Sequence, residues 1–202
     1  MYQYIYNEGQ VGEPVFILLH GTGGDETDLL PVAQVLNQNA SVLSIRGNVS
    51  ENGMNRYFKR HGEGQYDVLD LMKRGTELYK FIEDKSKEHD FSLEDAIYLG
   101  FSNGSNIAIN MLLQANSIVN KAMLYAPMYP VDVAEGLDLS AGKIFLSMGT
   151  NDPIVPKFES DRGIQIFEKL GADVTEFWVN SHELNGDNLL AGKRWLENIW
   201  GK

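Results

Sequence analysis

The stretch LGFSNGSNIA, residues 99–108, contains Ser102 with a glycine two residues to either side. An apolar run of strand type, residues 96–102, ends at this serine, and a helical pattern follows at 106–116. The pattern Gly-x-Ser-x-Gly occurs by chance in chains of this composition, but its position between a strand and a helix is what a catalytic serine turn requires. The stretch therefore predicts a serine hydroxyl held exposed on a strained turn, with a helix N-terminus directed at it.

The rest of the chain repeats the alternation of strand and helix patterns seen around Ser102. Strand-type runs occupy residues 2–6, 15–20, 41–47, 121–127, 143–149 and 174–180. Helical patterns occupy residues 28–38, 67–89, 157–171 and 188–200. Continuous apolar strands indicate burial on both faces, which is typical of parallel sheets, and the first run is expected to be an antiparallel edge strand. The prediction is an α/β fold with a mostly parallel twisted sheet of about seven strands, in one domain spanning residues 1–202.

Composition narrows the classes of function. The chain has no cysteine, so disulfides, thiolate catalysis and cysteine metal sites are excluded, and a reducing compartment is compatible. Its formal net charge of −11 argues weakly against nucleic acid and anionic membranes as partners, although solubility explains it as well. The N-terminal residues have neither the basic start nor the apolar run of a signal peptide, so none is expected, and no apolar run is long enough to span a membrane. We expect a soluble cytoplasmic protein without membrane insertion.

A serine nucleophile needs a base and an acid that orients the base, in the chain order Ser, Asp or Glu, His. Of the four histidines, only His182 follows Ser102, and it lies just after the last strand-type run. Asp152 follows the preceding strand, next to a proline that fixes a turn, and is the preferred acid. Asp132 is the second choice. The weaker candidates are Asp138, Asp187 and Glu183.

Two backbone N–H groups are expected to stabilise the oxyanion of the reaction. One should belong to Asn103, directly after the serine, and the other to Thr22 in the glycine-rich loop HGTGGDE, residues 20–26. A nucleotide-binding interpretation of this loop lacks the third glycine of the dinucleotide pattern and the lysine of a P-loop. No cluster of histidines and carboxylates has the spacing of a metal site, so neither metal nor cofactor is expected.

The chain resembles the α/β-hydrolases of the phospholipase/carboxylesterase family, which are small esterases without a cap domain. The matching segments are LLHGTGGDE (18–26), RGNVSENGMNRYF (46–58), LGFSNGSNIA (99–108), GTNDPIVP (149–156) and SHEL (181–184). The resemblance implies the roles already assigned to the catalytic and oxyanion residues, a small-molecule ester as substrate and a possible homodimer. Two departures are Ser105, where glycine or alanine is common, and Thr22, where many members carry leucine. Neither removes a backbone N–H.

The segment between the strand-type runs at 121–127 and 143–149, residues 127–142, is too short for a cap domain, so an open site walled by loops is expected. Candidate lining residues are Thr22, Tyr57, Phe58, Phe101, Met128 and Tyr129. Such a site suits a carboxylesterase acting on short acyl or aryl esters. A thioesterase or lysophospholipase for longer chains, a hydrolase of an aromatic, quinone-related breakdown product, and a non-catalytic binding protein on the same fold are the alternatives.

Overall fold

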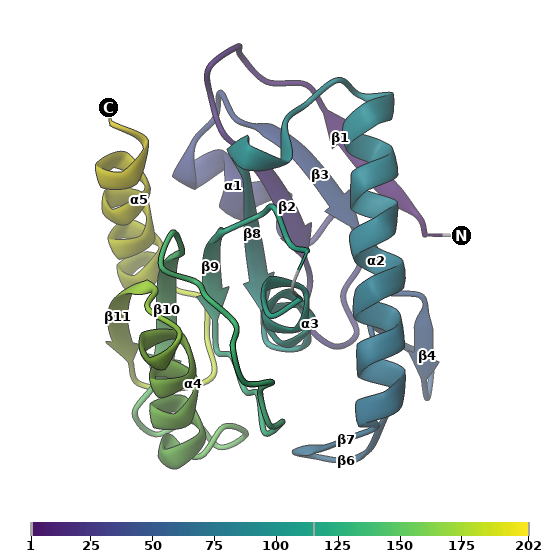
Figure 1. Cartoon of the computed structure of the whole chain (residues 1–202), viewed down its shortest axis with the longest axis vertical. Helices are drawn as coiled ribbons and strands as arrows, with labels where there is room; N and C mark the ends of the chain where they lie inside the picture. The colour runs from purple at the N-terminus through teal and green to yellow at the C-terminus, as the bar shows by residue number, and fades with distance from the viewer. Residues whose placement is uncertain (1, 115, 202) are drawn as a thin grey trace.

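The computed structural model describes residues 2–114 and 116–201 of the chain. Its centre is a seven-stranded sheet in the order β1-β3-β2-β8-β9-β10-β11 (Figure 1). The strands are β1 (Tyr4–Asn7), β2 (Val15–Leu19), β3 (Ser41–Ile45), β8 (Ala96–Phe101), β9 (Lys121–Tyr125), β10 (Lys143–Gly149) and β11 (Asp173–Val179). Only β1 runs antiparallel, against β3, and the remaining pairs are parallel. The predicted fold class and the antiparallel edge strand are confirmed.

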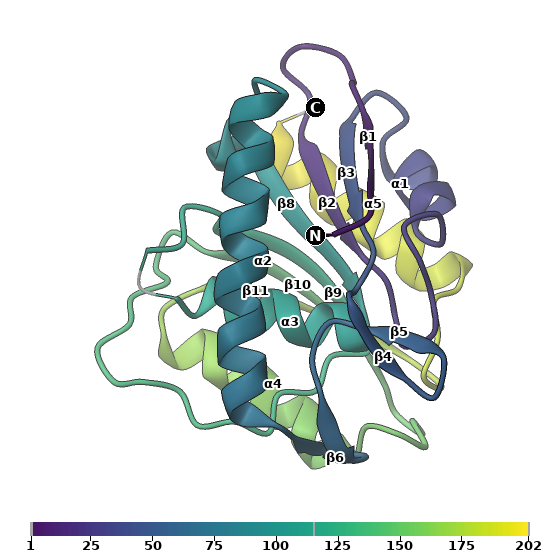
Figure 2. The same cartoon turned by 90° about the vertical axis from the view of Figure 1, so that its right-hand side faces the viewer.

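Helices cover both faces of the sheet, as Figure 2 shows from the side. They are α1 (Leu30–Leu36), α2 (Val68–Glu88), α3 (Asn103–Leu112), α4 (Lys157–Lys169) and α5 (Gly186–Trp200), with a short 3₁₀ turn at Leu93–Asp95. Strand β2 is buried throughout and contributes side chains to the hydrophobic core on each face of the sheet, because alternate side chains point to opposite faces. Phe16 and Leu18 pack with α1 and α5, whereas Ile17 and Leu19 pack with α2, α3 and α4.

Two small hairpins between β3 and α2 were not predicted from the sequence. They pair β4 (Val49–Glu51) with β5 (Met54–Arg56), and β6 (Arg60–Gly62) with β7 (Gln65–Tyr66). The first turns at Asn52 and Gly53, whose φ angles of 51° and 82° match the left-handed backbone that two-residue hairpin turns require. Both hairpins lie beyond the carboxyl ends of the parallel strands (Figures 1 and 2), which is where binding sites of open α/β sheets form.

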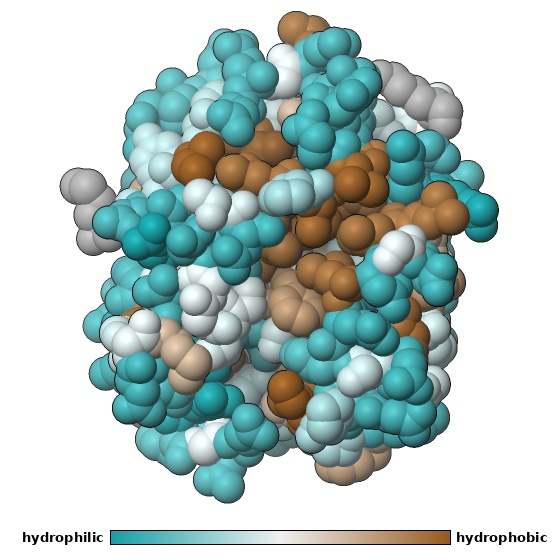
Figure 3. Space-filling view, turned by 180° about the vertical axis from the view of Figure 1, so that it is seen from behind, coloured by the Kyte–Doolittle hydropathy of each residue, from teal (hydrophilic) through white to brown (hydrophobic). Residues whose placement is uncertain are grey.

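Residues 126–142, between β9 and β10, contain neither helix nor strand, so the expectation of an uncapped site is confirmed. The face of the molecule that carries α1 and α5 shows an apolar band (Figure 3). Val35 on α1 and Leu190 on α5 are among the large apolar side chains that remain exposed. In the part of the chain that the structure describes, no helix has the length and apolar character needed to cross a membrane.

Candidate active site

Ser102 lies on the sharp turn between β8 and α3, with a φ of 51° and a ψ of −113°. A positive φ is unusual for a residue other than glycine and indicates backbone strain. The turn is held on both sides, because the Ser102 N–H donates to the Tyr125 carbonyl (2.8 Å) and the Ser102 carbonyl accepts from Asn106 N–H (3.0 Å). Helix α3 starts at Asn103 rather than at residue 106, so its N-terminus immediately follows the serine hydroxyl.

The flanking glycines make this turn sterically possible. A Cβ on Gly104 would collide with the backbone carbonyls of Leu19 and His20, and one on Gly100 would collide with the backbone of Ser105. Ser105 itself is fully buried, and its hydroxyl donates to the Tyr125 carbonyl at 2.9 Å. The turn therefore tolerates serine at position 105 but no side chain at position 104.

Replacing Gly104 by alanine is expected to lower the free energy of unfolding by at least about 3 kcal/mol, because backbone atoms cannot move aside as a flexible side chain can. In a chain of this size that corresponds to a fall in Tm of about 6–12 °C, measurable by calorimetry. The matched control is Gly163→Ala on α4, where an added Cβ meets no atom. That variant should gain about 0.5–1 kcal/mol, and equal destabilisation of both variants would contradict the steric account.

The structure brings Ser102, His182 and Asp152 into one hydrogen-bonded row. His182 Nε2 lies 2.9 Å from Ser102 Oγ, and His182 Nδ1 lies 2.7 Å from Asp152 Oδ2. The Asp152 side chain is 1% exposed, and its other oxygen accepts from the N–H groups of Ile154 (2.8 Å) and Val155 (2.9 Å). Two backbone N–H groups therefore hold Oδ1 of the carboxylate in place. The other oxygen, Oδ2, can only accept a hydrogen bond, so the proton between it and His182 belongs to Nδ1.

The loops that carry Asp152 and His182 support each other at the ends of β10 and β11. Thr150 N–H donates to the Val179 carbonyl (2.9 Å), and Asn151 N–H donates to the Asn180 carbonyl (2.8 Å). From the start of α5, the buried Asn188 amide donates to the Glu183 carbonyl, at 3.0 Å. These contacts fix the position of the imidazole through the backbone on both sides of it.

The competing acids lie in other surroundings. Asp132 is fully exposed and pairs with Arg162 at 3.1 Å, and Asp138 accepts from the N–H of Ser140. Glu183 accepts from Ser181 N–H within its own loop, and Asp187 lies in the first turn of α5. Of the described carboxylates, only Asp152 is hydrogen-bonded to His182.

His20 is a structural residue that anchors the glycine-rich loop. It is 1% exposed, and its Nε2 accepts from Gly47 N–H at 2.9 Å. Because the backbone N–H can only donate, the ring proton must be on Nδ1, which then donates to the Gly21 carbonyl at 2.6 Å. Burial lowers the pKa of His20 below its usual value of 6.5.

Stability should therefore fall as the pH drops below 6.5. In that range the unfolded chain binds a proton at His20 more readily than the folded protein does, so protonation favours unfolding. His20→Gln keeps an acceptor for Gly47 but does not titrate. We expect the variant to lose less unfolding free energy than the wild type between pH 7 and about pH 5, measured by urea denaturation. An unchanged slope in His20→Gln would refute the assignment.

Thr22 and Asn103 line the same cavity as Ser102. Within residues 2–114 and 116–201, the N–H groups of both donate to no protein acceptor. The side-chain oxygens of the two residues accept hydrogen bonds from other residues. The Asn103 amide oxygen accepts from Tyr57 N–H at 2.8 Å, and the Thr22 hydroxyl accepts from an Nη of Arg56. Two unpaired donors beside a serine hydroxyl can hold a developing negative charge.

A cavity of about 350 Å³ opens at Ser102 and His182. Thr22, Phe101 and Met128 line it as expected, and the Phe101 ring also contacts His182, with ring centres 5.3 Å apart. Tyr57, Phe58 and Tyr129 do not line it, so for these three the prediction was wrong. They are at most 2% exposed and belong to the core, where the Tyr57 hydroxyl donates to the Ile45 carbonyl (2.6 Å) and the Tyr129 hydroxyl accepts from Asn110 (3.1 Å).

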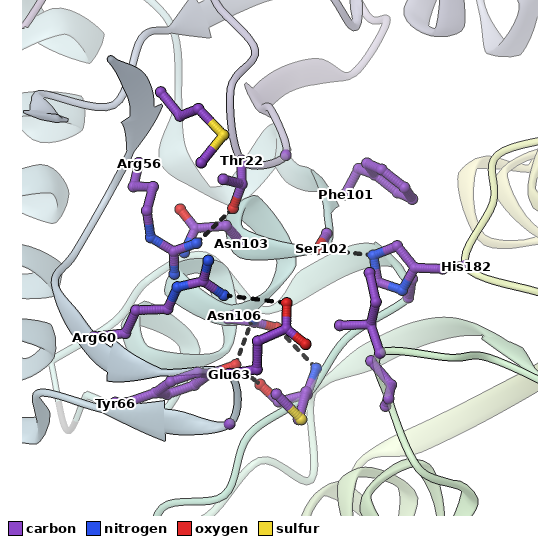
Figure 4. A pocket seen from close by; sticks show the side chains of 17 residues that line it. Thr22, Arg56, Arg60, Glu63, Tyr66, Phe101, Ser102, Asn103, Asn106 and His182 are labelled. Carbon is purple, nitrogen blue, oxygen red and sulfur yellow. Dashed lines mark hydrogen bonds and ion pairs between the residues drawn. The ribbon is translucent and has the colours of Figure 1, made fainter. Parts of the chain in front are cut away.

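Residues of the two unpredicted hairpins form the opposite wall of the cavity (Figure 4). The sequence analysis missed Arg56, Arg60, Glu63 and Tyr66 as lining residues, together with Asn106 on α3. The signal for the first hairpin is the dipeptide Asn52-Gly53, which favours a two-residue turn. Among the described residues, no group of three or more histidine, cysteine, aspartate or glutamate side chains is placed to hold a metal ion.

A mostly parallel sheet with a strained serine turn after β8 defines the class of the protein, the α/β-hydrolases. The chain is 36% identical over 196 residues to a Bacillus subtilis (strain 168) protein named "Putative hydrolase MhqD", covering 96% of this chain and 98% of that protein. The crystal structure of a Bacillus cereus carboxylesterase matches it with a TM-score of 0.95 and 39% identity, over 98% of this chain and 94% of that one.

A structure of YahD with malic acid matches with a TM-score of 0.94 and 31% identity, over 98% of this chain and 99% of that one. No family model matches the chain. On the strength of these relatives and the fold, the chain belongs to the phospholipase/carboxylesterase family of α/β-hydrolases. It is a carboxylesterase-type hydrolase.

Proposed function

We propose that the protein hydrolyses carboxylic esters through a catalytic triad of Ser102, His182 and Asp152. The observation that carries the proposal is the continuous hydrogen-bonded row from Ser102 Oγ through the imidazole to the buried Asp152 carboxylate, at the edge of an open cavity. A serine hydroxyl alone is a weak nucleophile, and an adjacent imidazole activates it by accepting its proton. Asp152 holds the imidazole in the tautomer whose Nε2 can accept and stabilises the cation that forms.

In the first half of the reaction, Ser102 Oγ attacks the ester carbonyl while its proton moves to His182 Nε2. The carbonyl oxygen becomes an oxyanion and accepts from the N–H groups of Thr22 and Asn103, and the N-terminus of α3 adds a favourable dipole. His182 then protonates the leaving alcohol oxygen, and the acyl group remains on the serine. In the second half, His182 takes a proton from water, the water attacks the acyl-enzyme, and the acid product leaves as Ser102 regains its proton.

The preferred substrates are esters with a short acyl or aryl group. The wall of the 350 Å³ cavity opposite His182 carries Arg56, Arg60 and Glu63, so a long alkyl chain extending there would have to desolvate charged side chains. This supports an esterase for short acyl groups over a thioesterase or lysophospholipase for long ones. An aromatic, quinone-related ester or lactone remains compatible with the same triad. Homodimerisation stays an expectation from the family resemblance, and a cytoplasmic location stays an expectation from the sequence.

A series of p-nitrophenyl esters from acetyl to palmitoyl tests the proposal. We expect kcat/KM to be highest for the short acyl groups and to fall steeply for the long ones, with an acyl-protein of the corresponding mass trapped by acid quench. A maximum at the long-chain end would favour the thioesterase or lysophospholipase alternative. Absence of both turnover and acyl-protein across the series would leave the non-catalytic binding protein as the better account.

A further inference from the structure

Two arginines face the cavity from the side opposite His182 (Figure 4). Arg56, at the end of β5, is only 3% exposed, and its guanidinium is held by the Phe58 carbonyl (3.3 Å), the Thr22 hydroxyl and the face of the Phe58 ring. Burial lowers the pKa of Arg56, but a guanidinium stays protonated in proteins. The cavity wall thus contains a rigid, buried cation.

Arg60, at the start of β6, is the second cation of this wall. Its Nε donates to both oxygens of Glu51, at 3.0 and 3.1 Å, and the same carboxylate lies 3.7 Å from Arg56 Nε. One carboxylate therefore pairs with two guanidinium groups, hydrogen-bonded to the Nε of Arg60 and in ionic contact with Arg56, whose Nε donates to the Phe58 carbonyl. In the part of the chain that the structure describes, the Nη2 groups of both arginines donate to no protein acceptor.

Glu63 is the remaining anion of the wall, and its contact is weak. Its side chain is 67% exposed and lies 3.9 Å from Arg60 Nη1, beyond hydrogen-bond distance. An exposed pair of this kind contributes little stability, so a ligand can displace the glutamate at small cost. When Glu63 is displaced, two cations face the cavity and only the Glu51 carboxylate balances them. Because these charges are largely buried, their electrostatic attraction for a further anion is strong.

We propose that Arg56 and Arg60 form a carboxylate-binding subsite, so that the preferred esters carry a free carboxylate at the far end of a short acyl chain. The inference rests on the proposed function of Ser102 and His182. Planar guanidinium groups suit a carboxylate because their paired N–H groups match its two oxygens. The substrate class is therefore the monoesters of short dicarboxylic acids.

The position of His182 assigns the subsite to the acyl side of the substrate. His182 gives its proton to the leaving oxygen, so the alcohol part of the ester must lie on the histidine side of Ser102. The acyl part then extends to the opposite side, where the arginines lie (Figure 4). The Thr22 contact supports this direction, since the residue proposed to hold the carbonyl oxygen also contacts Arg56 through its hydroxyl.

The test compares two esters that differ in one charge: mono-p-nitrophenyl glutarate and the same compound with its free carboxylate methylated. The Ser102→Ala protein serves as the blank for spontaneous cleavage. We expect the wild type to have a higher kcat/KM for the charged ester. Arg60→Gln should lower the ratio of charged to neutral kcat/KM by about 10- to 100-fold, the loss expected for hydrogen bonds to a charged group.

Arg74→Gln on α2 is the matched control. Arg74 is also about one-fifth exposed and pairs with Asp70 at 3.4 Å, but it does not line the cavity, so its loss should leave the ratio unchanged. If Arg60→Gln folds poorly, Arg60→Lys takes its place in the test. This variant keeps the charge but lacks the planar guanidinium, so it should give a ratio between those of the wild type and a variant without the charge. The subsite alone would be overturned if the protein cleaves the neutral ester and does not prefer the charged one. It would also be overturned if Arg60→Gln leaves the ratio of charged to neutral kcat/KM unchanged. Failure to cleave either ester would overturn the proposed function.

Discussion

Replacing Ser102 by alanine is expected to lower kcat for a short p-nitrophenyl ester by at least about 10⁴-fold, the usual consequence of removing a triad nucleophile. The variant should fold normally. The hydrogen bonds that hold the turn come from the Ser102 backbone, and alanine tolerates the positive φ no worse than serine does. Steady-state kinetics with a calorimetric Tm for each protein separates loss of chemistry from loss of structure.

Ser105→Ala is the control for that experiment. Ser105 lies one turn further along α3, is fully buried, and bonds the Tyr125 carbonyl. That carbonyl keeps its bond from Ser102 N–H in the variant, so the cost should stay near 1 kcal/mol, typical for one buried hydrogen bond. We expect kcat to remain close to the wild-type value. Retained activity in Ser102→Ala, or its loss in Ser105→Ala alone, would show that the wrong serine has been assigned.

Asp152→Asn is expected to lower kcat by about 10⁴-fold with little change in stability. The N–H groups of Ile154 and Val155 require an oxygen at the Oδ1 position, so the asparagine must turn its NH₂ toward His182. His182 Nδ1 then has to accept, which places the ring proton on Nε2. An Nε2 that carries a proton cannot take the proton of Ser102. Kinetics at neutral pH measure the loss.

The control for the acid is Asp132→Asn. Asp132 was the second choice from the sequence, but it is exposed and its contact is a surface pair with Arg162. Removing such a pair changes stability by at most about 1 kcal/mol, and it should leave kcat unchanged. If Asp152→Asn keeps kcat within about tenfold of the wild type, far short of the usual loss, the buried carboxylate does not orient the base.

The architecture was predictable because each strand and helix carries its own periodic signal. Ser102, Asp152 and His182 were predictable as neighbours because parallel strands bring their carboxyl ends to one edge of the sheet. Chain order and the position of each residue after its strand were enough to select them, and the structure brings the three side chains together.

The cavity wall was not predictable in the same way. Tyr57 and Phe58 were expected to line the site because they are aromatic, yet aromatic side chains are found both in hydrophobic cores and in cavity walls. Which side chain of the 46–58 segment faces the cavity depends on the register of two short hairpins, and strands of two or three residues carry no usable periodicity. The hairpins turn Arg56 toward the cavity and Tyr57 toward the core. The charged end of the cavity therefore becomes visible only in three dimensions.

The central claim is that His182 and Asp152 activate Ser102, and covalent labelling tests it most directly. The purified protein is incubated with a fluorophosphonate, and any adduct is located by mass spectrometry, with Ser102→Ala and Ser105→Ala treated in parallel. We predict a single adduct on Ser102 in the wild type and in Ser105→Ala, and none in Ser102→Ala. Folded wild-type protein that takes up no label, or that is labelled at another residue, would contradict the account.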